Sequence, residues 1–358
     1  MTQSSVNHLS IGIDLGDRYS HMYVLDRATR EVVEEGRIRT TRSAFEQRFA
    51  EMPPARVAIE VGTHSPWVSR LLTAAGHEVK IANAYKLRLI YENDSKSDRV
   101  DAEYLARLAA ADPKLLHPLE HRKEEHQATR AVLIARDRLV ACRTKLINSI
   151  RGTVKAFGER LPSSDTSVFY KKVADHVPEA LRPAVGPLLE TLAYIEQRIR
   201  AYDKEIERLG AQAYPQTRAL RQVKGVGPIT SLNYVVTISN PQNFKKSRDV
   251  GSYLGLRPRR RSSGRGDPEL RISKAGDGML RRHLVQSAQY MLGPHGVDCD
   301  LKRWGLKLAA RGGKTAKKKA IVAVARKLAV LLHRLWITGQ PYEPLRNANK
   351  AAAKVATV

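Results

Sequence analysis

LSIGIDLG, residues 9–16, is an apolar run of strand length that carries one carboxylate, Asp14. An ionised side chain in such a strand is costly unless a partner or a cation balances it. A second apolar run, RVAIEVG at residues 56–62, also carries a single acid, Glu60. If these strands are neighbours in one sheet, the two carboxylates lie side by side, where they repel each other unless they share a proton or a divalent cation.

Strand and helix patterns alternate around these two runs. Their order, β-β-β-α-β-α-β, predicts a mixed sheet with helices packed on it, which is an α/β fold. The predicted strands lie at residues 9–16, 21–27, 31–40, 56–62 and 77–83, and the predicted helices at 45–52 and 65–76.

The middle of the chain has the apolar periodicity of helices. Residues 132–157 and 188–209 repeat apolar side chains at steps of three, four and seven, which is typical of a coiled-coil seam. Between them, the proline- and serine-containing stretch from Leu161 to Pro187 is interpreted as a link. The pattern leaves open whether the two helices pair as an antiparallel hairpin or dimerise.

The remainder is predicted to be mostly helical, so the fold class is α/β plus all-α. Residues 220–238 indicate two helices joined by a glycine-rich turn, and 250–278 indicate a basic loop. Helices are expected at 279–292 and 315–336. The predicted domains are 1–120 (mixed sheet), 121–215 (helical), 216–340 (basic and mostly helical) and 341–358 (a tail).

The positive charge of the chain is concentrated at one end. The 358 residues include 62 Lys and Arg and 36 Asp and Glu, a formal net charge of +26. Residues 1–120 contain 16 basic and 17 acidic residues, whereas residues 216–358 contain 29 and 7. This asymmetry predicts that the C-terminal part binds a polyanion.

Composition excludes several other classes of protein. Two cysteines, Cys142 and Cys299, are too few for a disulfide framework or a four-thiolate zinc site. The N-terminus lacks a signal-peptide pattern, and the most apolar stretch, 320–336, is interrupted by charged residues. We therefore expect a protein that is located in the bacterial cytoplasm or nucleoid and does not bind a membrane.

Two further acids extend the pair formed by Asp14 and Glu60. Asp98 and Asp101 are three residues apart at a predicted helix start, so they share one helix face. Four oxygen donors suit Mg²⁺ or Mn²⁺, and two such ions roughly 4 Å apart can clamp a phosphodiester. Each acid alone has a plainer interpretation, namely helix capping or a surface position, but the four together favour a metal site.

Two motifs point to phosphate binding in the basic part. KGVGPIT, residues 224–230, resembles a helix-hairpin-helix turn, in which glycines let backbone N–H groups approach a phosphate beside Lys224; an ordinary turn is the alternative. RPRRRSSGRGDPELRISKAG, residues 257–276, surrounds two serines with basic side chains that bind phosphate oxygens. These are Arg257, Arg259, Arg260, Arg261, Arg265, Arg271 and Lys274; Arg281 and Arg282 of the next predicted helix complete the predicted nucleic-acid contacts.

A serine within such a cluster is suited to attack phosphorus while the arginines stabilise the developing charge. The candidates are Ser262 and Ser263, and composition alone favours a basic loop with incidental serines. No histidine lies nearby in the sequence to act as a base.

Taken in order, these motifs resemble the insertion-sequence transposases that join an N-terminal RuvC-like DEDD domain to a C-terminal serine-bearing domain. The Piv-type DNA invertases are related to that family, and some members are guided by a bridge RNA. IGIDLG, AIEVGTH, KSDRVDAEYLA, VKGVGPITS, YLGLRPRRRSSG and RISKAGDGMLRRHL carry the resemblance over nearly the whole chain.

The resemblance implies an RNase H/RuvC-like first domain, a coiled-coil middle and a helical transposase domain. It implies that Ser263 is the nucleophile and that Asp14, Glu60, Asp98 and Asp101 hold Mg²⁺ or Mn²⁺. The expected reaction is DNA strand cleavage and rejoining. The expected partners are donor and target DNA, a non-coding bridge RNA, and further copies of the chain in a dimer or tetramer.

Two other functions remain as alternatives. A DNA- or RNA-binding protein without catalysis would use the same basic region and leave Asp14 and Ser263 dispensable. A sugar-kinase or chaperone-type ATPase would share the IGIDLG run with its first phosphate loop. That fold needs a second lobe of similar topology, which the heptads and the basic C-terminal part contradict.

Overall fold

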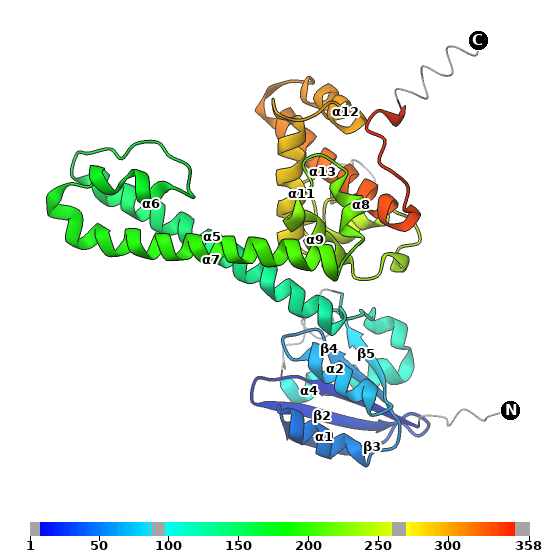
Figure 1. Ribbon diagram of the computed structural model, residues 1–358. Helices are drawn as coiled ribbons and strands as arrows, with labels where there is room; N and C mark the ends of the chain where they lie inside the picture. Colours follow the sequence, from blue (N-terminus) through cyan, green and yellow to red (C-terminus); the bar gives the residue numbers. More distant parts are fainter. Residues whose placement is uncertain (1–7, 85, 88–96, 260–269, 348–358) are drawn as a thin grey trace, which may run out of the picture. The chain divides into compact units, whose positions relative to one another are not determined.

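β1 (Leu9–Asp14) is the middle strand of a five-stranded mixed sheet with the order β3-β2-β1-β4-β5 (Figure 1). It pairs antiparallel with β2 and parallel with β4, and β4 pairs parallel with β5. The mixed α/β sheet and all five predicted strands are confirmed. The other strands are β2 (Tyr19–Asp26), β3 (Val32–Arg39), β4 (Arg56–Glu60) and β5 (Glu78–Ala82).

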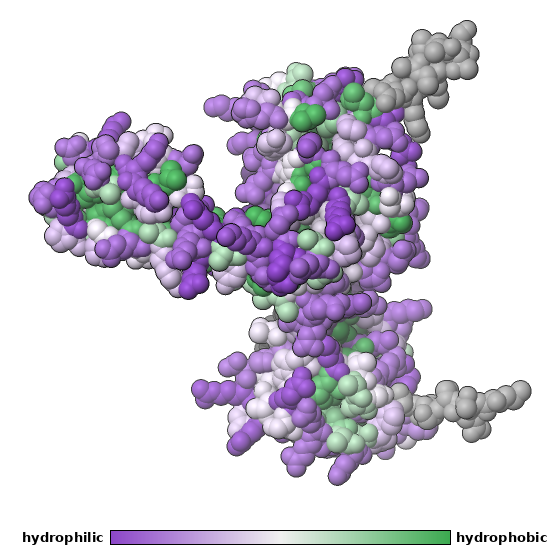
Figure 2. All heavy atoms as spheres, in the orientation of Figure 1, coloured by the Kyte–Doolittle hydropathy of each residue, from purple (hydrophilic) through white to green (hydrophobic). Residues whose placement is uncertain are grey.

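The computed structural model describes residues 8–84, 86–87, 97–259 and 270–347. The chain divides into two compact units, Met1–Arg122 and Lys123–Val358. Hydrophilic side chains cover most of the surface seen in Figure 2. In the described residues, no helix combines the length and the apolar character needed to span a bilayer.

Helices cover both faces of the sheet in the first unit. Strand side chains alternate between the faces, so each face presents apolar side chains that a helix can bury. On one face, Ile11 and Ile59 pack with Phe45 of α1 (Arg42–Ala50) and Leu72 of α2 (Ser65–Ala74). On the other face lies α4 (Asp98–Ala111), which contacts β1, β2 and β4. A short helical turn, η1 (Pro113–Leu116), follows α4.

The second unit contains two long helices that pack against each other, α5 (Glu124–Ala156) and α7 (Arg182–Gln212) (Figure 1). The ion pairs Arg136–Asp203 and Arg143–Glu196 advance along α5 as they go back along α7, so the helices are antiparallel. Of the two arrangements that the periodicity left open, the structure has the pair within one chain.

The link between the long helices is shorter than predicted and is folded. Because α7 starts at Arg182, Pro183 and Pro187 belong to the helix, and their assignment to the link was wrong. Pro183 lies in the first turn, where its missing N–H has no intrahelical partner to lose. The link contains α6 (Phe169–Lys172), η2 (Ala174–His176) and η3 (Glu179–Leu181).

Shorter helices complete the second unit. The two helices around KGVGPIT, the helix at 279–292 and the basic helix at 315–336 are confirmed. The amphipathic α12 was not predicted. The elements are α8 (Thr217–Arg221), α9 (Pro228–Ile238), η4 (Pro241–Asn243), α10 (Asp249–Tyr253), α11 (Gly278–Leu292), α12 (Asp300–Ala309) and α13 (Gly313–Thr338).

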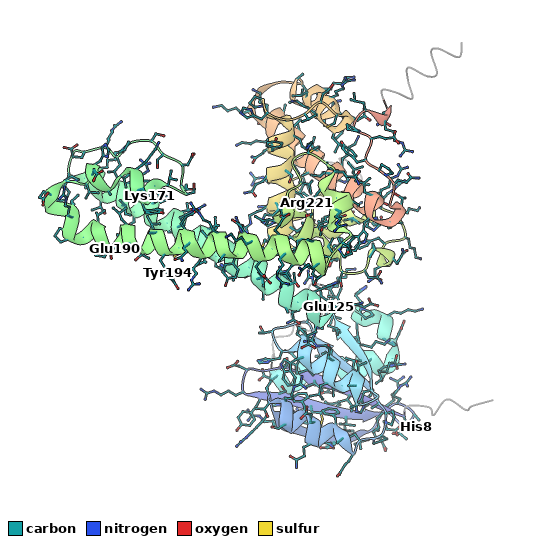
Figure 3. The ribbon with its side chains drawn as sticks, viewed as in Figure 1. His8, Glu125, Lys171, Glu190, Tyr194 and Arg221 are labelled. Carbon is teal, nitrogen blue, oxygen red and sulfur yellow. The ribbon has the colours of Figure 1, made fainter. Side chains whose placement is uncertain are left out.

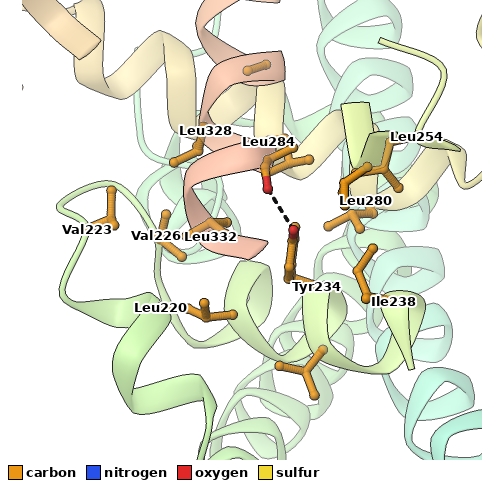
Figure 4. Packing of buried hydrophobic residues seen from close by; sticks show 14 of the residues in the cluster. Leu220, Val223, Val226, Tyr234, Ile238, Leu254, Leu280, Leu284, Leu328 and Leu332 are labelled. Atoms are coloured by element: carbon orange, nitrogen blue, oxygen red, sulfur yellow. Dashed lines mark hydrogen bonds between the residues drawn. The ribbon is translucent and has the colours of Figure 1, made fainter. Parts of the chain in front are cut away.

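The core of this unit is built around α9, which is buried over most of its length. Tyr234 is fully buried there, and its hydroxyl donates a hydrogen bond to the Ala329 carbonyl of α13 at 2.7 Å (Figure 4). Leu133 of α5 and Ile206 of α7 belong to the same core. The long helices are therefore anchored at one end in the core that supports the glycine-rich turn.

Candidate functional site

Asp14 and Glu60 lie at the same end of neighbouring parallel strands. Asp14 is the last residue of β1, and Glu60 is the last residue of β4. The register pairs Ile13 with Ile59, one position before the two acids. The sheet therefore brings the two predicted carboxylates together at the carboxyl ends of its central strands, and both are partly buried.

Asp14 lies on the face of the sheet that α4 covers. Side chains two positions apart in a strand share a face, so Ser10, Gly12 and Asp14 belong together. The Ser10 hydroxyl donates a hydrogen bond of 2.8 Å to the Ala106 carbonyl of α4. A Cβ on Gly12 would lie 2.0 Å from the Ala102 carbonyl oxygen, so the helix passes directly over this strand.

The same argument places Glu60 on this face. Arg56 lies four residues before Glu60 in β4 and therefore shares its face. It donates from Nη1 to the Ala109 carbonyl at 3.1 Å. Ala58 packs with Leu105 and Ala109 of α4. Glu60 continues the series Arg56, Ala58, Glu60 and therefore faces the helix side.

The direction of α4 brings the other two acids to the same edge. The helix lies over the start of β4 at Ala109 and over Gly12 of β1 at Ala102, so it runs antiparallel to both strands. Its first turn, with Asp98 and Asp101, is consequently at the carboxyl ends of β1 and β4. Asp101 is buried, with 7% exposure, whereas Asp98 is exposed.

Helix capping does not account for these acids. The N-cap of α4 is Ser97, whose hydroxyl accepts the Val100 N–H at 3.3 Å. An acid buried in the first turn of an already capped helix has a further reason to be there, because burial of a carboxylate is costly. We call Asp14, Glu60, Asp98 and Asp101 the carboxylate edge.

The carboxylate edge fits a divalent cation by the chemistry of its donors. All four side chains supply oxygen, which Mg²⁺ and Mn²⁺ prefer over nitrogen or sulfur. Among the described residues, no three His, Cys, Asp or Glu side chains are already grouped as a metal site. The shared edge and the donor type support cation binding, and the final ligand geometry is not preformed.

The basic loop is held together at its base. Pro258 and Ile272 form an antiparallel bridge, and the Arg259 N–H donates to the Arg271 carbonyl at 3.0 Å. Gly255, with φ +68°, makes this possible, since a Cβ there would lie 2.1 Å from the Ala275 carbonyl. The predicted site residues Arg260, Arg261, Ser262, Ser263 and Arg265 lie outside the described residues.

The predicted nucleic-acid contacts differ in how they are placed. Arg257, Arg271 and Lys274 are exposed on the two legs of the loop. Arg281 instead donates from Nη1 to the carbonyls of Leu254 and Ala275, each at 3.0 Å, and so joins the legs. Arg259 is exposed and donates to the Ser273 carbonyl, and Arg282 pairs with Asp137 at 2.8 Å.

The end of the loop is also anchored through a buried ion pair. Asp277 caps α11 by accepting the Leu280 N–H at 2.8 Å. The guanidinium of Arg130 on α5 donates to the other oxygen of this carboxylate, whose side chain is 4% exposed. The loop legs are thereby fixed to both α5 and α11.

A polar pocket of about 480 Å³ opens beside the glycine-rich turn. Gly225 has φ +95°, and a Cβ there would lie 3.0 Å from the Tyr290 ring, so only glycine fits without strain. Lys224 and Arg221 line the pocket (Arg221 is labelled in Figure 3), and Arg221 pairs with Glu207 at 2.6 Å. Two cations beside a helix start are suited to a phosphate.

His283 lines the same pocket and was not predicted. Its Nδ1 lies 3.0 Å from Asn233 Nδ2, which donates to it, so the ring hydrogen is on Nε2. Burial is the main cause that lowers the pKa of His283 to about 4. No local pattern marks this residue, because it reaches the turn only when α11 packs against α9.

This fold and these carboxylates define a class. A mixed sheet of this order, with helices on both faces and acids at the carboxyl ends of its central strands, is consistent with the RNase H/RuvC-like enzymes that process nucleic acids. A sugar-kinase or chaperone-type ATPase would need a second, similar lobe, and the described residues from Lys123 to Asn347 contain no strand of one.

Comparison with known proteins identifies the family. Residues 11–158 match the model of DEDD-type IS110 transposases, and residues 217–296 match the model described as the transposase IS116/IS110/IS902 family. The chain belongs to this family of insertion-sequence transposases. In these matches nothing supports the expected kinship with Piv-type invertases or a serine-recombinase character of the second domain.

Curated relatives agree. The transposase of insertion sequence IS1328 from Yersinia enterocolitica is 31% identical over 285 residues, which cover 78% of this chain and 82% of the relative. The transposase of IS1111A from Coxiella burnetii is 30% identical and covers 70% of each chain. A putative transposase from Sinorhizobium fredii is 27% identical over 93% of this chain and 85% of its own.

Proposed function

We propose that this transposase cleaves and rejoins DNA strands through a serine nucleophile, Ser263, together with a cation site at the carboxylate edge. The observation that carries the proposal is the common location of Asp14, Glu60 and Asp101 on one face and at one edge of the sheet. Oxygen donors that share one edge of a sheet are suited to hold Mg²⁺ or Mn²⁺.

When bound, such a cation would neutralise the charge of a phosphodiester and orient it. Asp14 and Glu60 would hold it from the strand ends, and Asp98 and Asp101 from the first turn of α4. The stiffness of the sheet supports this role, because neighbouring strands fix the separation of their last residues.

The serine step is a transesterification. Ser263 Oγ attacks the phosphorus and gives up its hydroxyl proton, the bond from phosphorus to the leaving strand breaks, and the leaving oxygen takes up a proton. The DNA then remains joined to the protein as a phosphoserine ester. In the second half a strand hydroxyl attacks this ester, the bond from phosphorus to serine breaks, and the serine oxygen regains a proton.

Basic residues would support both steps of the transesterification. Arg257, Arg271 and Lys274 are exposed on the loop legs, which flank the serine segment in the sequence, and would stabilise the negative charge on the phosphate. Lys224 at the pocket of the glycine-rich turn would hold the strand backbone. The basic composition of residues 216–358 supports DNA as the partner.

We further propose a bridge RNA as guide and a dimer or tetramer as the active assembly, both on the basis of the resemblance. RNA that co-purifies with the protein, identified by sequencing, would support the guide. Light scattering of the purified protein would measure the assembly. A strictly monomeric protein that recombines DNA without RNA would contradict both.

The central test separates chemistry from binding. Ser263→Ala should abolish the covalent protein–DNA adduct, and Asp14→Asn should lower strand cleavage at least about 100-fold. Both variants should keep DNA affinity close to that of the wild type, because neither side chain supplies positive charge. Adducts are measured on denaturing gels, and binding is measured by electrophoretic mobility.

Matched controls are Ser262→Ala, beside the proposed nucleophile, and Glu46→Gln, an exposed acid on α1. Both should recombine DNA at nearly the wild-type rate. If Ser263→Ala keeps the adduct while Ser262→Ala loses it, the nucleophile is misassigned. If Asp14→Asn cleaves DNA normally, the carboxylate edge has no catalytic role.

A further inference from the structure

A histidine lies next to the carboxylate edge in the turn that connects Glu60 to α2. This turn is closed by Ser65, whose hydroxyl accepts the Gly62 N–H and donates to the Gly62 carbonyl, each at 2.9 Å. His64, which directly precedes Ser65, is the N-cap residue of α2, and its side chain makes no capping hydrogen bond. The position of the ring is therefore not explained by helix capping.

Trp67 fixes the ring and its tautomer. The indole Nε1–H donates to His64 Nδ1 at 3.1 Å, with the two rings perpendicular. Trp67 is itself held edge-on against Phe45 in the apolar core of the first unit. Because Nδ1 accepts this hydrogen bond, the ring hydrogen lies on Nε2.

The Nε2 side of the ring faces the turn that follows Asp14. Asp17 Oδ1 lies 3.7 Å from His64 Nε2, and the Asp17 side chain is 95% exposed. His64 thus presents an N–H donor between the two turns that leave β1 and β4, at the edge where Asp14 and Glu60 end their strands. An exposed partner at this distance contributes little by itself, so Asp17 does not account for so well-fixed a ring.

We propose that His64 contacts the substrate at the carboxylate edge, where its Nε2–H donates a hydrogen bond to a phosphate oxygen of the bound strand. This inference rests on the proposed function of that edge. A phosphodiester that approaches several carboxylates needs donors as well as a cation, and a fixed N–H loses little freedom when it binds. Trp67 is the positioning residue, because it sets which nitrogen donates.

The test combines protein variants with modified DNA. His64→Phe keeps a ring without a donor, and His64→Gln restores an N–H at a similar reach. Methylphosphonate, in which a methyl group replaces one non-bridging phosphate oxygen and the linkage is uncharged, is placed at one linkage at a time near the cleavage position. Cleavage rates of the full-length protein are measured for each pair, with thermal unfolding as a check on the fold.

We expect His64→Phe to cleave roughly 10- to 100-fold more slowly and His64→Gln to recover most of that loss. The methylphosphonate that slows the wild type most should change the rate of His64→Phe less than about twofold, since the contact is already gone. Trp67→Phe should give an intermediate loss. His8→Phe is the control, because His8 is exposed just before β1, at the end of the strand opposite to Asp14 (Figure 3).

Two outcomes would overturn the proposal. One is a His64→Phe protein that cleaves like the wild type; the other is one that loses activity but keeps the full wild-type response at every modified linkage. Asp14→Asn distinguishes failure of the His64 proposal from failure of the proposed function. If Asp14→Asn cleaves normally, the carboxylate edge itself is not a catalytic site. If Asp14→Asn is inactive and His64→Phe is normal, only the role of His64 is rejected.

Discussion

Gly12 and Ala102 meet where β1 and α4 cross: a side chain on Gly12 would place its Cβ 2.0 Å from the Ala102 carbonyl oxygen and 2.5 Å from the Ala106 nitrogen. Both of these are backbone atoms, which have little room to move. The close approach lets Asp101, one residue before Ala102, reach the level of Asp14. Gly12 therefore sets the spacing of the carboxylate edge.

Gly12→Ala should push α4 away from the sheet. We expect a loss of about 1–3 kcal/mol or more in the free energy of unfolding, together with a loss of cleavage, because the acids are separated. Urea unfolding and cleavage assays measure the two effects. Gly36→Ala in β3, where a Cβ meets nothing within 4 Å, should change neither. Equal unfolding free energies and cleavage rates for the two variants would contradict the close approach of α4 to Gly12.

Arg130→Met should leave the carboxylate of Asp277 buried without its cation. We expect a loss of about 3–5 kcal/mol in the free energy of unfolding, since an uncompensated buried charge is costly. Asp277→Asn should cost less, because the amide oxygen can still cap α11. The exposed pair Arg303–Asp298 is the comparison, and Arg303→Met should cost at most about 1 kcal/mol. Similar losses for both arginines would count against the anchoring role.

His283 should make the folded protein sensitive to acid. Its pKa is lowered by burial from 6.5 to about 4, so the unfolded chain binds more protons than the folded protein between these values. Stability should therefore fall as the pH decreases from 6.5 to 4, with a contribution on the order of 3 kcal/mol from this residue. His283→Gln should flatten the pH dependence in that window. His77, His121 and His333 also have lowered pKa values, so only the difference between the two proteins is informative.

Lys224→Gln should weaken DNA binding at every sequence. If Lys224 neutralises one phosphate at the pocket, the slope of log affinity against log salt should become shallower by about one. Fluorescence anisotropy at several salt concentrations measures the slope. Lys171→Gln, at an exposed position on α6, is the control (Figure 3). An unchanged slope for Lys224→Gln would place the phosphate contacts elsewhere.

Much of the architecture is readable from local patterns. Five strand-like runs predict the five strands, and heptad spacing predicts α5 and α7, because a helix seam or a buried sheet face must be apolar to pack. The prolines of α7 mislead, since a helix tolerates proline in its first turn and long-range packing outweighs one missing hydrogen bond beyond it.

The candidate site is readable only as a set of residue types. Acids within apolar strands and at a helix start are conspicuous because burial of charge is costly. The sequence does not show that these acids lie at one edge of the sheet. That location depends on the parallel pairing of β1 with β4 and on α4 running antiparallel to both strands. His283 has no local signal at all, because its partner Asn233 is distant in the chain. Arg281 is predicted as a nucleic-acid contact, whereas its hydrogen bond to the Leu254 carbonyl is visible only in the structure.

The sequence alone therefore determines the five strands and most of the helices, the four acids, the basic C-terminal part and, by resemblance, the family of transposases. Only the tertiary structure shows that α4 lies against Gly12 and that Arg281 joins the legs of the basic loop. The physical reason is distance along the chain. Local patterns record what each segment must bury, whereas the partner of a side chain depends on how the segments pack together.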